Sequence, residues 1–191
     1  MSHSHHEPHV EHGGEHGNNK KVAILISVLA ALLAIVETAG KNAQTLYLSH
    51  QVEASNLWAF YQAKTIRRTA VLVQLDRLQL DRALNPEVAG QAADERQAAW
   101  RGDVDRWESE PETGEGRREL MARAQQQERL RDASSQRYHR FEYGSAALQL
   151  AIVLASASIV TGMMILAWGA VGLGGLGTAF ALWGWLGIAV T

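Results

Sequence analysis

Side chains capable of holding a metal gather at the start of the chain. Within the first 19 residues, six histidines are interspersed with glutamates and glycines: His3, His5, His6, His9, His12 and His16. Imidazole nitrogens and carboxylate oxygens are ligands of zinc and nickel, so the alternative interpretation is weak capture of one of these metals. The favoured interpretation is a solvated tail without a cofactor, whose positive charge rises as the pH falls through about 6.5.

Two further histidine–glutamate pairs lie deeper in the chain. His50 with Glu53, and His139 with Glu142, each place both side chains on one face of a helix. Helical bundles build di-metal sites from glutamates and Glu-x-x-His motifs, but here the order is reversed and the bridging glutamates are missing. Surface ion pairing is therefore favoured over an enzymatic site between His50 and His139.

The remaining chemical signals are weak. Residues 172–177 match the letters of a dinucleotide-binding fingerprint, but they lie in apolar sequence that no predicted strand precedes and no acid follows. The chain has no cysteine, which excludes disulfides and thiolate metal sites. Since neither a nucleophilic triad nor a phosphate loop is present, the sequence predicts that the protein is not an enzyme.

Apolar blocks at both ends predict a membrane protein. Residues 22–40 form a helix of about 28 Å, close to the roughly 30 Å thickness of the hydrocarbon layer. Residues 145–191 are uncharged and long enough for two spans, with a reversal expected near residues 168–172. The interpretation is three transmembrane helices in a lipid bilayer, preceded by a disordered tail over residues 1–21.

The segment between the apolar blocks, residues 41–144, is polar and helical in pattern. It holds 16 of the 18 basic and 16 of the 20 acidic residues, so it has no basic field of the kind that attracts nucleic acid. Helices are expected over residues 41–84, 86–107 and 117–143, with a turn at 108–116. Their lengths match if the second and third run back along the first. The predicted fold class is therefore an all-α membrane protein with a long, coiled-coil-like antiparallel helical hairpin between its first and second transmembrane helices.

The first helix of this hairpin carries two apolar stripes. One has the alternating spacing of four and three residues that is typical of a coiled-coil seam. Its members are Ala59, Ala63, Ile66, Ala70, Val73, Arg77, Leu80 and Leu84. The second stripe comprises Leu57, Tyr61, Val71, Leu75 and Leu78. Two stripes indicate more than one packing partner, and the predicted partner between chains is a second copy or another membrane protein.

A motif on the same helix identifies a family resemblance. Residues 58–68, Trp-Ala-Phe-Tyr-Gln-Ala-Lys-Thr-Ile-Arg-Arg, resemble the signature of a bacterial membrane family known as domain of unknown function 4337 (DUF4337). The His/Glu-rich tail and residues 138–149 extend the likeness over most of the chain. The resemblance implies a protein of the bacterial inner membrane and supplies no activity.

Five side chains of this motif are candidates for an interaction site: Trp58, Tyr61, Lys64, Arg67 and Arg68. The aromatic pair can cover a partner helix, and the three basic residues form a charged face. That face could pair with acids on the returning helix, or dock an anionic lipid or protein. Packing within the chain is the favoured role.

The best functional hypothesis is a non-enzymatic scaffold or accessory subunit that associates through its soluble hairpin. The alternative is a metal-capturing or metal-responsive membrane protein acting through the histidine-rich tail. Basic residues near the membrane are more numerous on the hairpin side than at Lys20 and Lys21, which favours a cytoplasmic hairpin.

Overall fold

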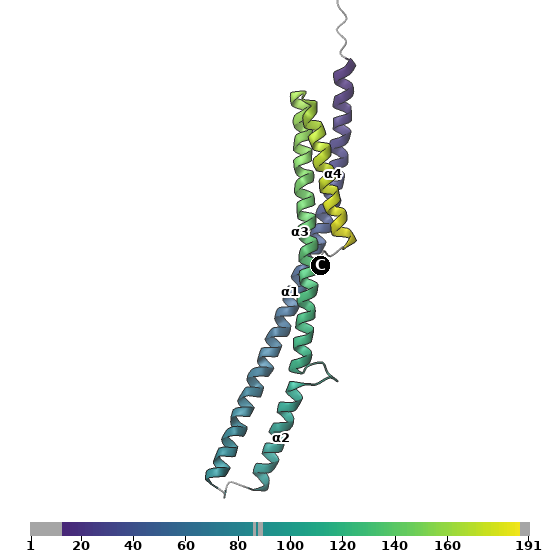
Figure 1. The fold of residues 1–191 in the computed structure, drawn as a ribbon. Helices are drawn as coiled ribbons and strands as arrows, with labels where there is room; N and C mark the ends of the chain where they lie inside the picture. The colour runs from purple at the N-terminus through teal and green to yellow at the C-terminus, as the bar shows by residue number, and fades with distance from the viewer. Residues whose placement is uncertain (1–12, 86, 88–89, 188–191) are drawn as a thin grey trace, which may run out of the picture. The chain divides into compact units, whose positions relative to one another are not determined.

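The computed structural model describes residues 13–85, 87 and 90–187, and this part of the chain is helical with no strand. The helices are α1 (Gly13–Leu84), α2 (Gln91–Glu108), α3 (Arg117–Thr161) and α4 (Met164–Leu186) (Figure 1). The predicted all-α class is confirmed. Three of the helices, α1, α3 and α4, contain stretches long and apolar enough to cross a membrane.

The chain divides into two compact units. We call Met1–Gln44 with Ser135–Thr191 the terminal unit, and Thr45–Ser134 the central unit. Helices α1 and α3 each contribute to both units. The central unit is shorter at both ends than the soluble segment predicted over residues 41–144.

The start of α1 differs from the predicted boundary. The sequence indicated a disordered tail over residues 1–21, yet the backbone is helical from Gly13 onward. Adding residues to an existing helix costs far less than starting one, so the long apolar helix can extend into polar sequence. Residues 1–12 lie outside the described part of the chain.

The core of the terminal unit is made by α1, α3 and α4. Leu29 and Val36 of α1 pack with Phe141 and Leu148 of α3 in one buried cluster. Small residues line the contact between α3 and α4, because Ala151, Ala155 and Ala170 have no exposed surface. The two backbones also approach closely, because a Cβ placed on Gly177 would lie 2.8 Å from the carbonyl oxygen of Gly144.

The reversal between α3 and α4 lies earlier than predicted. It was expected near residues 168–172, but α3 ends at Thr161 and α4 begins at Met164. Gly162 has a φ of +69°, the left-handed conformation that commonly ends a helix, and its N–H donates to the carbonyl of Ser158 at 3.0 Å. The later glycines serve helix contact instead, since Gly174 and Gly177 are buried.

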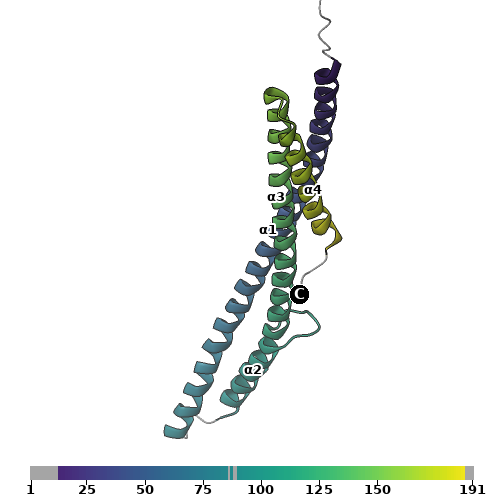
Figure 2. The same ribbon diagram turned by 45° about the horizontal axis from the view of Figure 1, so that its top comes forward.

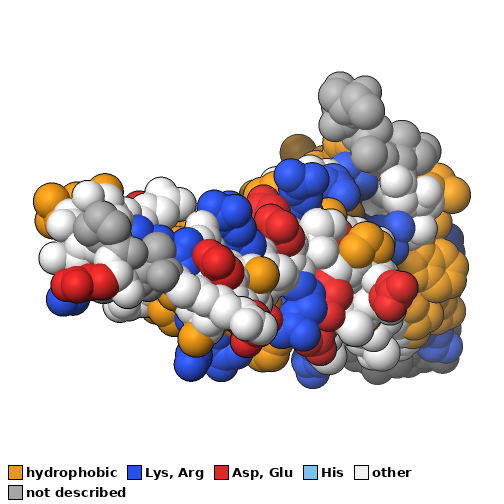
Figure 3. Space-filling model, turned by 90° about the horizontal axis from the view of Figure 1, so that it is seen from below, with side chains coloured by type: hydrophobic (Ala, Val, Ile, Leu, Met, Phe, Trp, Pro, Cys, Tyr) orange, Lys and Arg blue, Asp and Glu red, His pale blue; other side chains and the backbone are white. Residues whose placement is uncertain are grey.

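In the central unit, α2 and the first part of α3 both contact α1. Arg82 of α1 reaches α2, donating to Gln97 at 2.8 Å and pairing with Asp94 at 2.9 Å. Leu57 of α1 packs with Leu120 and Ala124 of α3. The second half of α1 and α2 lie side by side in both ribbon views (Figures 1 and 2). On the face seen in Figure 3, basic and acidic side chains are interspersed, with hydrophobic side chains between them.

The face of α1 that turns inward in the central unit repeats every seven residues. Its buried and half-buried positions alternate in steps of three and four: Tyr47, His50, Ala54, Leu57, Tyr61, Lys64, Arg68, Val71, Leu75, Leu78 and Arg82. This is the second apolar stripe of the sequence with polar members added. The predicted seam occupies the other side of the helix, and all eight of its side chains are exposed. Ile66 and Leu84, for example, keep 70% and 69% of their surface.

The contact between α3 and α4 can be tested with two glycines of the same helix. Gly177→Ala places a methyl group against the Gly144 carbonyl and Leu148, so the helices must separate; overpacking of this kind costs about 1–3 kcal/mol. We expect a lower melting temperature in detergent, followed by circular dichroism. Gly175→Ala is the control, because a Cβ there meets nothing within 4 Å. Equal melting temperatures for the two variants would contradict the close approach.

Candidate functional site

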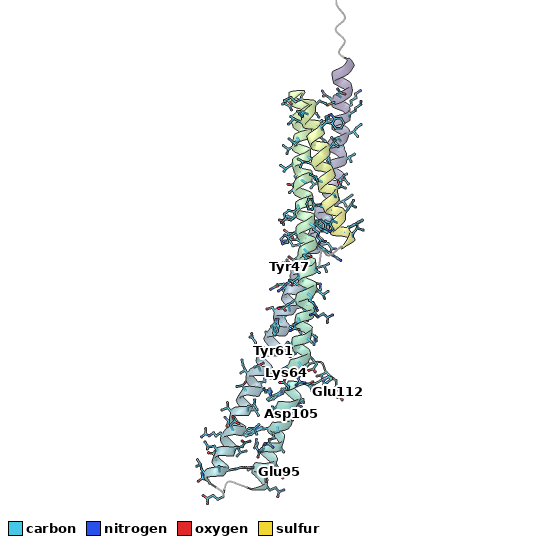
Figure 4. All side chains as sticks on the ribbon, viewed as in Figure 1. Tyr47, Tyr61, Lys64, Glu95, Asp105 and Glu112 are labelled. Atoms are coloured by element: carbon cyan, nitrogen blue, oxygen red, sulfur yellow. The ribbon has the colours of Figure 1, made fainter. Side chains whose placement is uncertain are left out.

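Charged side chains join α1 to the turn between α2 and α3. The Lys64 ammonium lies 3.6 Å from a carboxylate oxygen of Glu110 and 3.9 Å from one of Glu115. Only 9% of Lys64 is exposed, which is unusual for a lysine and requires compensating partners. Figure 4 shows Tyr61 and Lys64 on α1 at the level of this turn, which carries Glu112.

Glu108 at the end of α2 is the centre of a larger cluster. Its Oε2 atom accepts a hydrogen bond from Arg117 at 2.6 Å and lies 3.3 Å from Nε of Arg68. Arg118 approaches its other oxygen at 3.5 Å. One carboxylate thus gathers three guanidinium groups, from α1 and from the start of α3. We call Lys64, Arg68, Glu108, Glu110 and Arg117 the charged cluster.

Arg117 also ties the charged cluster to the aromatic residues of α1. It donates to the hydroxyl oxygens of Tyr61 and Thr65, both at 2.9 Å, and its guanidinium lies 4.9 Å from the centre of the Tyr61 ring. Trp58 packs edge-on against Tyr61 and donates its indole N–H to Glu128 of α3 at 3.0 Å. Charged, aromatic and apolar contacts therefore hold the same stretch of α1 against α3.

The turn itself is closed by Glu119. Its carboxylate accepts hydrogen bonds from the Ser109 hydroxyl at 2.7 Å and from the Glu110 backbone N–H at 3.2 Å. Gly116 makes this possible, because a Cβ there would collide with the Glu119 carboxylate and the Glu110 backbone. Glycine is required at this position by the close approach of the chain, not by an unusual φ.

The surroundings of Glu108 and Glu119 lower the pKa of both carboxyls. Burial alone would raise the pKa of Glu108, but the charge and hydrogen bond of Arg117 and the charge of Arg68 outweigh it. The pKa of Glu119 is lowered mainly by the hydrogen bond from Ser109. Both groups therefore stabilise the fold as carboxylates.

Four of the five predicted interaction residues make contacts within the chain. Trp58, Tyr61, Lys64 and Arg68 contact α3, the turn or the end of α2, as described above. Arg67 is exposed and has no partner among the described residues. The basic face predicted from Lys64, Arg67 and Arg68 is thus divided, because positions 64 and 68 fall on the inward heptad face of α1 and position 67 does not.

Sequence reasoning did not single out Glu108, Glu110 or Arg117, and it identified Gly116 only as part of the predicted turn. The available signal was the density of charge over residues 108–119, opposite a basic stretch of the predicted partner helix. The sequence suggested pairing with acids on the returning helix, but the register that selects Glu108 and Glu110 comes from the packing.

The histidines considered for metal chemistry lie in different surroundings. Nδ1 of His50 is 2.8 Å from the amide oxygen of Gln127, and Nδ1 of His139 is 3.2 Å from Glu142. Among the residues that the structure describes, no three His, Asp or Glu side chains are grouped so that they could hold a metal ion. His3, His5, His6, His9 and His12 lie outside that part, as does the His16 side chain, so metal capture by the tail stays a prediction.

Comparison with known proteins identifies a family whose description assigns no function. The model of the family described as "Domain of unknown function (DUF4337)" matches residues 18–187, nearly the whole chain. No curated protein and no solved structure matches.

The pH dependence of stability in the variant Glu108→Gln tests the charged cluster. Because folding lowers the pKa of Glu108, its contribution is complete above the ordinary value of about 4.3 and is lost as the pH falls through the folded-state value. At pH 7 we expect the variant to lose about 1–3 kcal/mol, because Arg117 and Arg68 lose their charged partner. The variant should lose less stability than the wild type on acidification. Both effects are measurable by thermal unfolding in detergent between pH 7 and pH 3.

Glu112→Gln is the matched control for this measurement. Glu112 lies in the same turn, is exposed and has no ion pair among the described residues. An acid profile of Glu108→Gln that matches those of Glu112→Gln and the wild type would contradict the role assigned to Glu108.

Proposed function

Because the chain belongs to the DUF4337 family, whose description assigns no activity, we propose a function from its structure: a membrane-anchored, non-enzymatic scaffold or accessory subunit that self-associates through the central unit. The observation that carries this proposal is the predicted seam on α1, which is fully exposed although a second face of the same helix is packed. A helix with both faces apolar has one more packing surface than its own chain fills.

Anchoring in a bilayer is supported by the surface of the terminal unit. Its helices expose large apolar side chains: Val160, Ile165 and Trp168 keep 87%, 71% and 72% of their surface. Soluble proteins rarely expose large contiguous apolar patches, whereas lipid covers such a surface at no cost. The three candidate spans lie in α1, α3 and α4, and the three residues named here belong to α3 and α4.

The proposed soluble part is an antiparallel helical hairpin formed by the central unit. Contacts between α1 and the returning chain support this direction. His50 meets Gln127, Tyr61 meets Arg117, and Arg82 meets Asp94, so later positions of α1 face earlier positions of the return. The anchor is proposed to lie in the bacterial inner membrane, with the hairpin in the cytoplasm, as the excess of basic residues on that side favours.

A second copy of the same chain is the proposed occupant of the seam. Copies anchored on the same side of one membrane present α1 in the same direction, which is the geometry of a parallel coiled coil. The steps of three and four fit this partner, and Ala59, Ala63 and Ala70 permit a close approach. No packing against α2 or α3 competes for these side chains in the described structure.

The acidic residues near Arg77 in the sequence can compensate its charge in such a parallel dimer. It lies in the seam between Asp76 and Asp81, and none of the three makes an ion pair among the described residues. In a parallel pair, the long Arg77 side chain can leave the seam and reach Asp76 of the second copy. A single polar residue in a seam fixes the register at a cost in affinity.

Cysteine substitution tests the seam directly, because the chain has no cysteine. Val73→Cys should give a covalent dimer when membranes are treated with a short bismaleimide, read on a denaturing gel. Gln79→Cys is the control: it is exposed on the same helix but lies outside the seam. Equal cross-linking at the two positions would eliminate the seam as the contact.

Arg77→Leu should tighten the dimer. Replacing the charge by an apolar side chain in the seam adds about 1.5–3 kcal/mol of burial, so the dissociation constant should fall about tenfold or more. The measurement is energy transfer between labelled copies diluted in detergent. Arg101→Leu adds the same side chain to an exposed position of α2 and should leave the affinity unchanged. An unaltered dimer in Arg77→Leu would count against an intermolecular seam.

A further inference from the structure

An apolar groove lies between α1 and α4 in the terminal unit. Its walls are formed by side chains of α1 and α4, among them Ile35, Leu182 and Trp185, together with Phe141 of α3. Thr178 is the one hydroxyl, and it donates to the Gly174 carbonyl at 2.8 Å. The walls expose no polar atom to the groove, so nothing along them attracts a polar molecule.

The size of the groove limits what can occupy it. It encloses about 110 Å³, well below the roughly 300–1,000 Å³ of sites that hold a whole small molecule. Its rim is open, with Ile35, Leu182 and Trp185 exposed by 60%, 53% and 73%. An open apolar groove of this volume suits a segment of a hydrocarbon chain.

Two arginines of α3 lie near the groove residue Phe141: Arg137 is one helical turn before it, and Arg140 is next to it in the sequence. Arg137 is four residues before Phe141 on α3, so both side chains lie on the same face of the helix. A Cβ placed on Gly187, where α4 ends, would lie 2.9 Å from the Arg137 guanidinium, and one on Gly184 would lie 3.2 Å from the Phe141 ring. The Arg140 guanidinium lies 4.7 Å from the centre of the Trp183 ring.

In the described part of the chain, no acidic side chain balances the charge of these arginines. Neither makes an ion pair among the described residues, and the nearby Glu142 lies 3.2 Å from His139 instead. The carboxyl end of α4 supplies a partial charge of only about −0.5, against two guanidinium groups. Guanidinium groups bind phosphate oxygens through paired hydrogen bonds, so an anionic phosphate complements this end of the groove.

We propose that the groove and the two arginines together bind one anionic glycerophospholipid. The phosphate lies at Arg137 and Arg140, and an acyl chain lies along Ile35, Leu182 and Trp185. This inference rests on the membrane location in the proposed function, and it is independent of self-association through the central unit.

Native mass spectrometry of the full chain in detergent tests this site. Phosphatidylglycerol and phosphatidylcholine with identical acyl chains are added separately, and we expect one phosphatidylglycerol to be retained in preference. Arg137→Gln combined with Arg140→Gln should weaken its binding about 30-fold. Arg67→Gln combined with Arg101→Gln removes the same charge from exposed positions of the central unit and should have no effect.

A second variant separates recognition from folding. Arg137→Lys combined with Arg140→Lys keeps the positive charge, so it should retain most of the preference for the anionic lipid. Equal retention of the two lipids by the wild type would overturn the proposal, as would equal losses in the glutamine pair and the control pair. A protein that stays in solution without detergent would refute the membrane anchor itself, whereas failure of lipid selectivity alone would leave the anchor and the dimer standing.

Discussion

A long helix that packs through a seven-residue repeat buries only one of its faces against the rest of its own chain. In the central unit, α1 gives the face of Ala54, Leu57 and Leu75 to α2 and α3. That choice decides which side chains are internal, which is why Lys64 and Arg68 of the family motif are used in ion pairs with the turn. It equally decides that the alanine-rich seam remains outside. The charged cluster and the proposed dimer surface are thus two consequences of one register.

The charged cluster explains how a polar sequence can keep that register. Apolar packing between α1 and α3 is thin at this level, where Leu57, Leu120 and Ala124 form a small cluster. Arg117 adds directed contacts to Glu108, Tyr61 and Thr65, which a shift of either helix by one residue would break. Directional polar contacts specify alignment even where they add little net stability.

The sequence alone predicted most of the helices, but it did not predict which face of α1 packs against the rest of the chain. Hydropathy and helix breakers indicated the all-α class and the turn that begins after Glu108, because both depend on local residue types. Choosing between the two stripes of α1 required knowing what lies opposite, and both had coiled-coil spacing. The seam of Ala59 to Leu84 had the more regular spacing, yet the chain packs the stripe that can pair its charges.

The other differences have the same origin. Gly162 ends α3, whereas the reversal was predicted near residues 168–172. A glycine ends a helix only where the chain must adopt a positive φ, and elsewhere it serves contact, as Gly177 does against Gly144. Similarly, α2 begins at Gln91 after an extended Gly90, later than the start predicted at residue 86. Glycine and proline mark candidate boundaries, and packing selects among them.

The brevity of the link between α3 and α4 bears on how such a chain enters a bilayer. Only Gly162 and Met163 separate the two helices, and no ionisable residue occurs from Ser145 to Leu186. In the proposed membrane location, these helices would partition together as a prefolded pair, and no ion would have to be carried through hydrocarbon to the far leaflet. The barrier to moving this half of the anchor across the bilayer then comes mainly from the few polar backbone groups of the link.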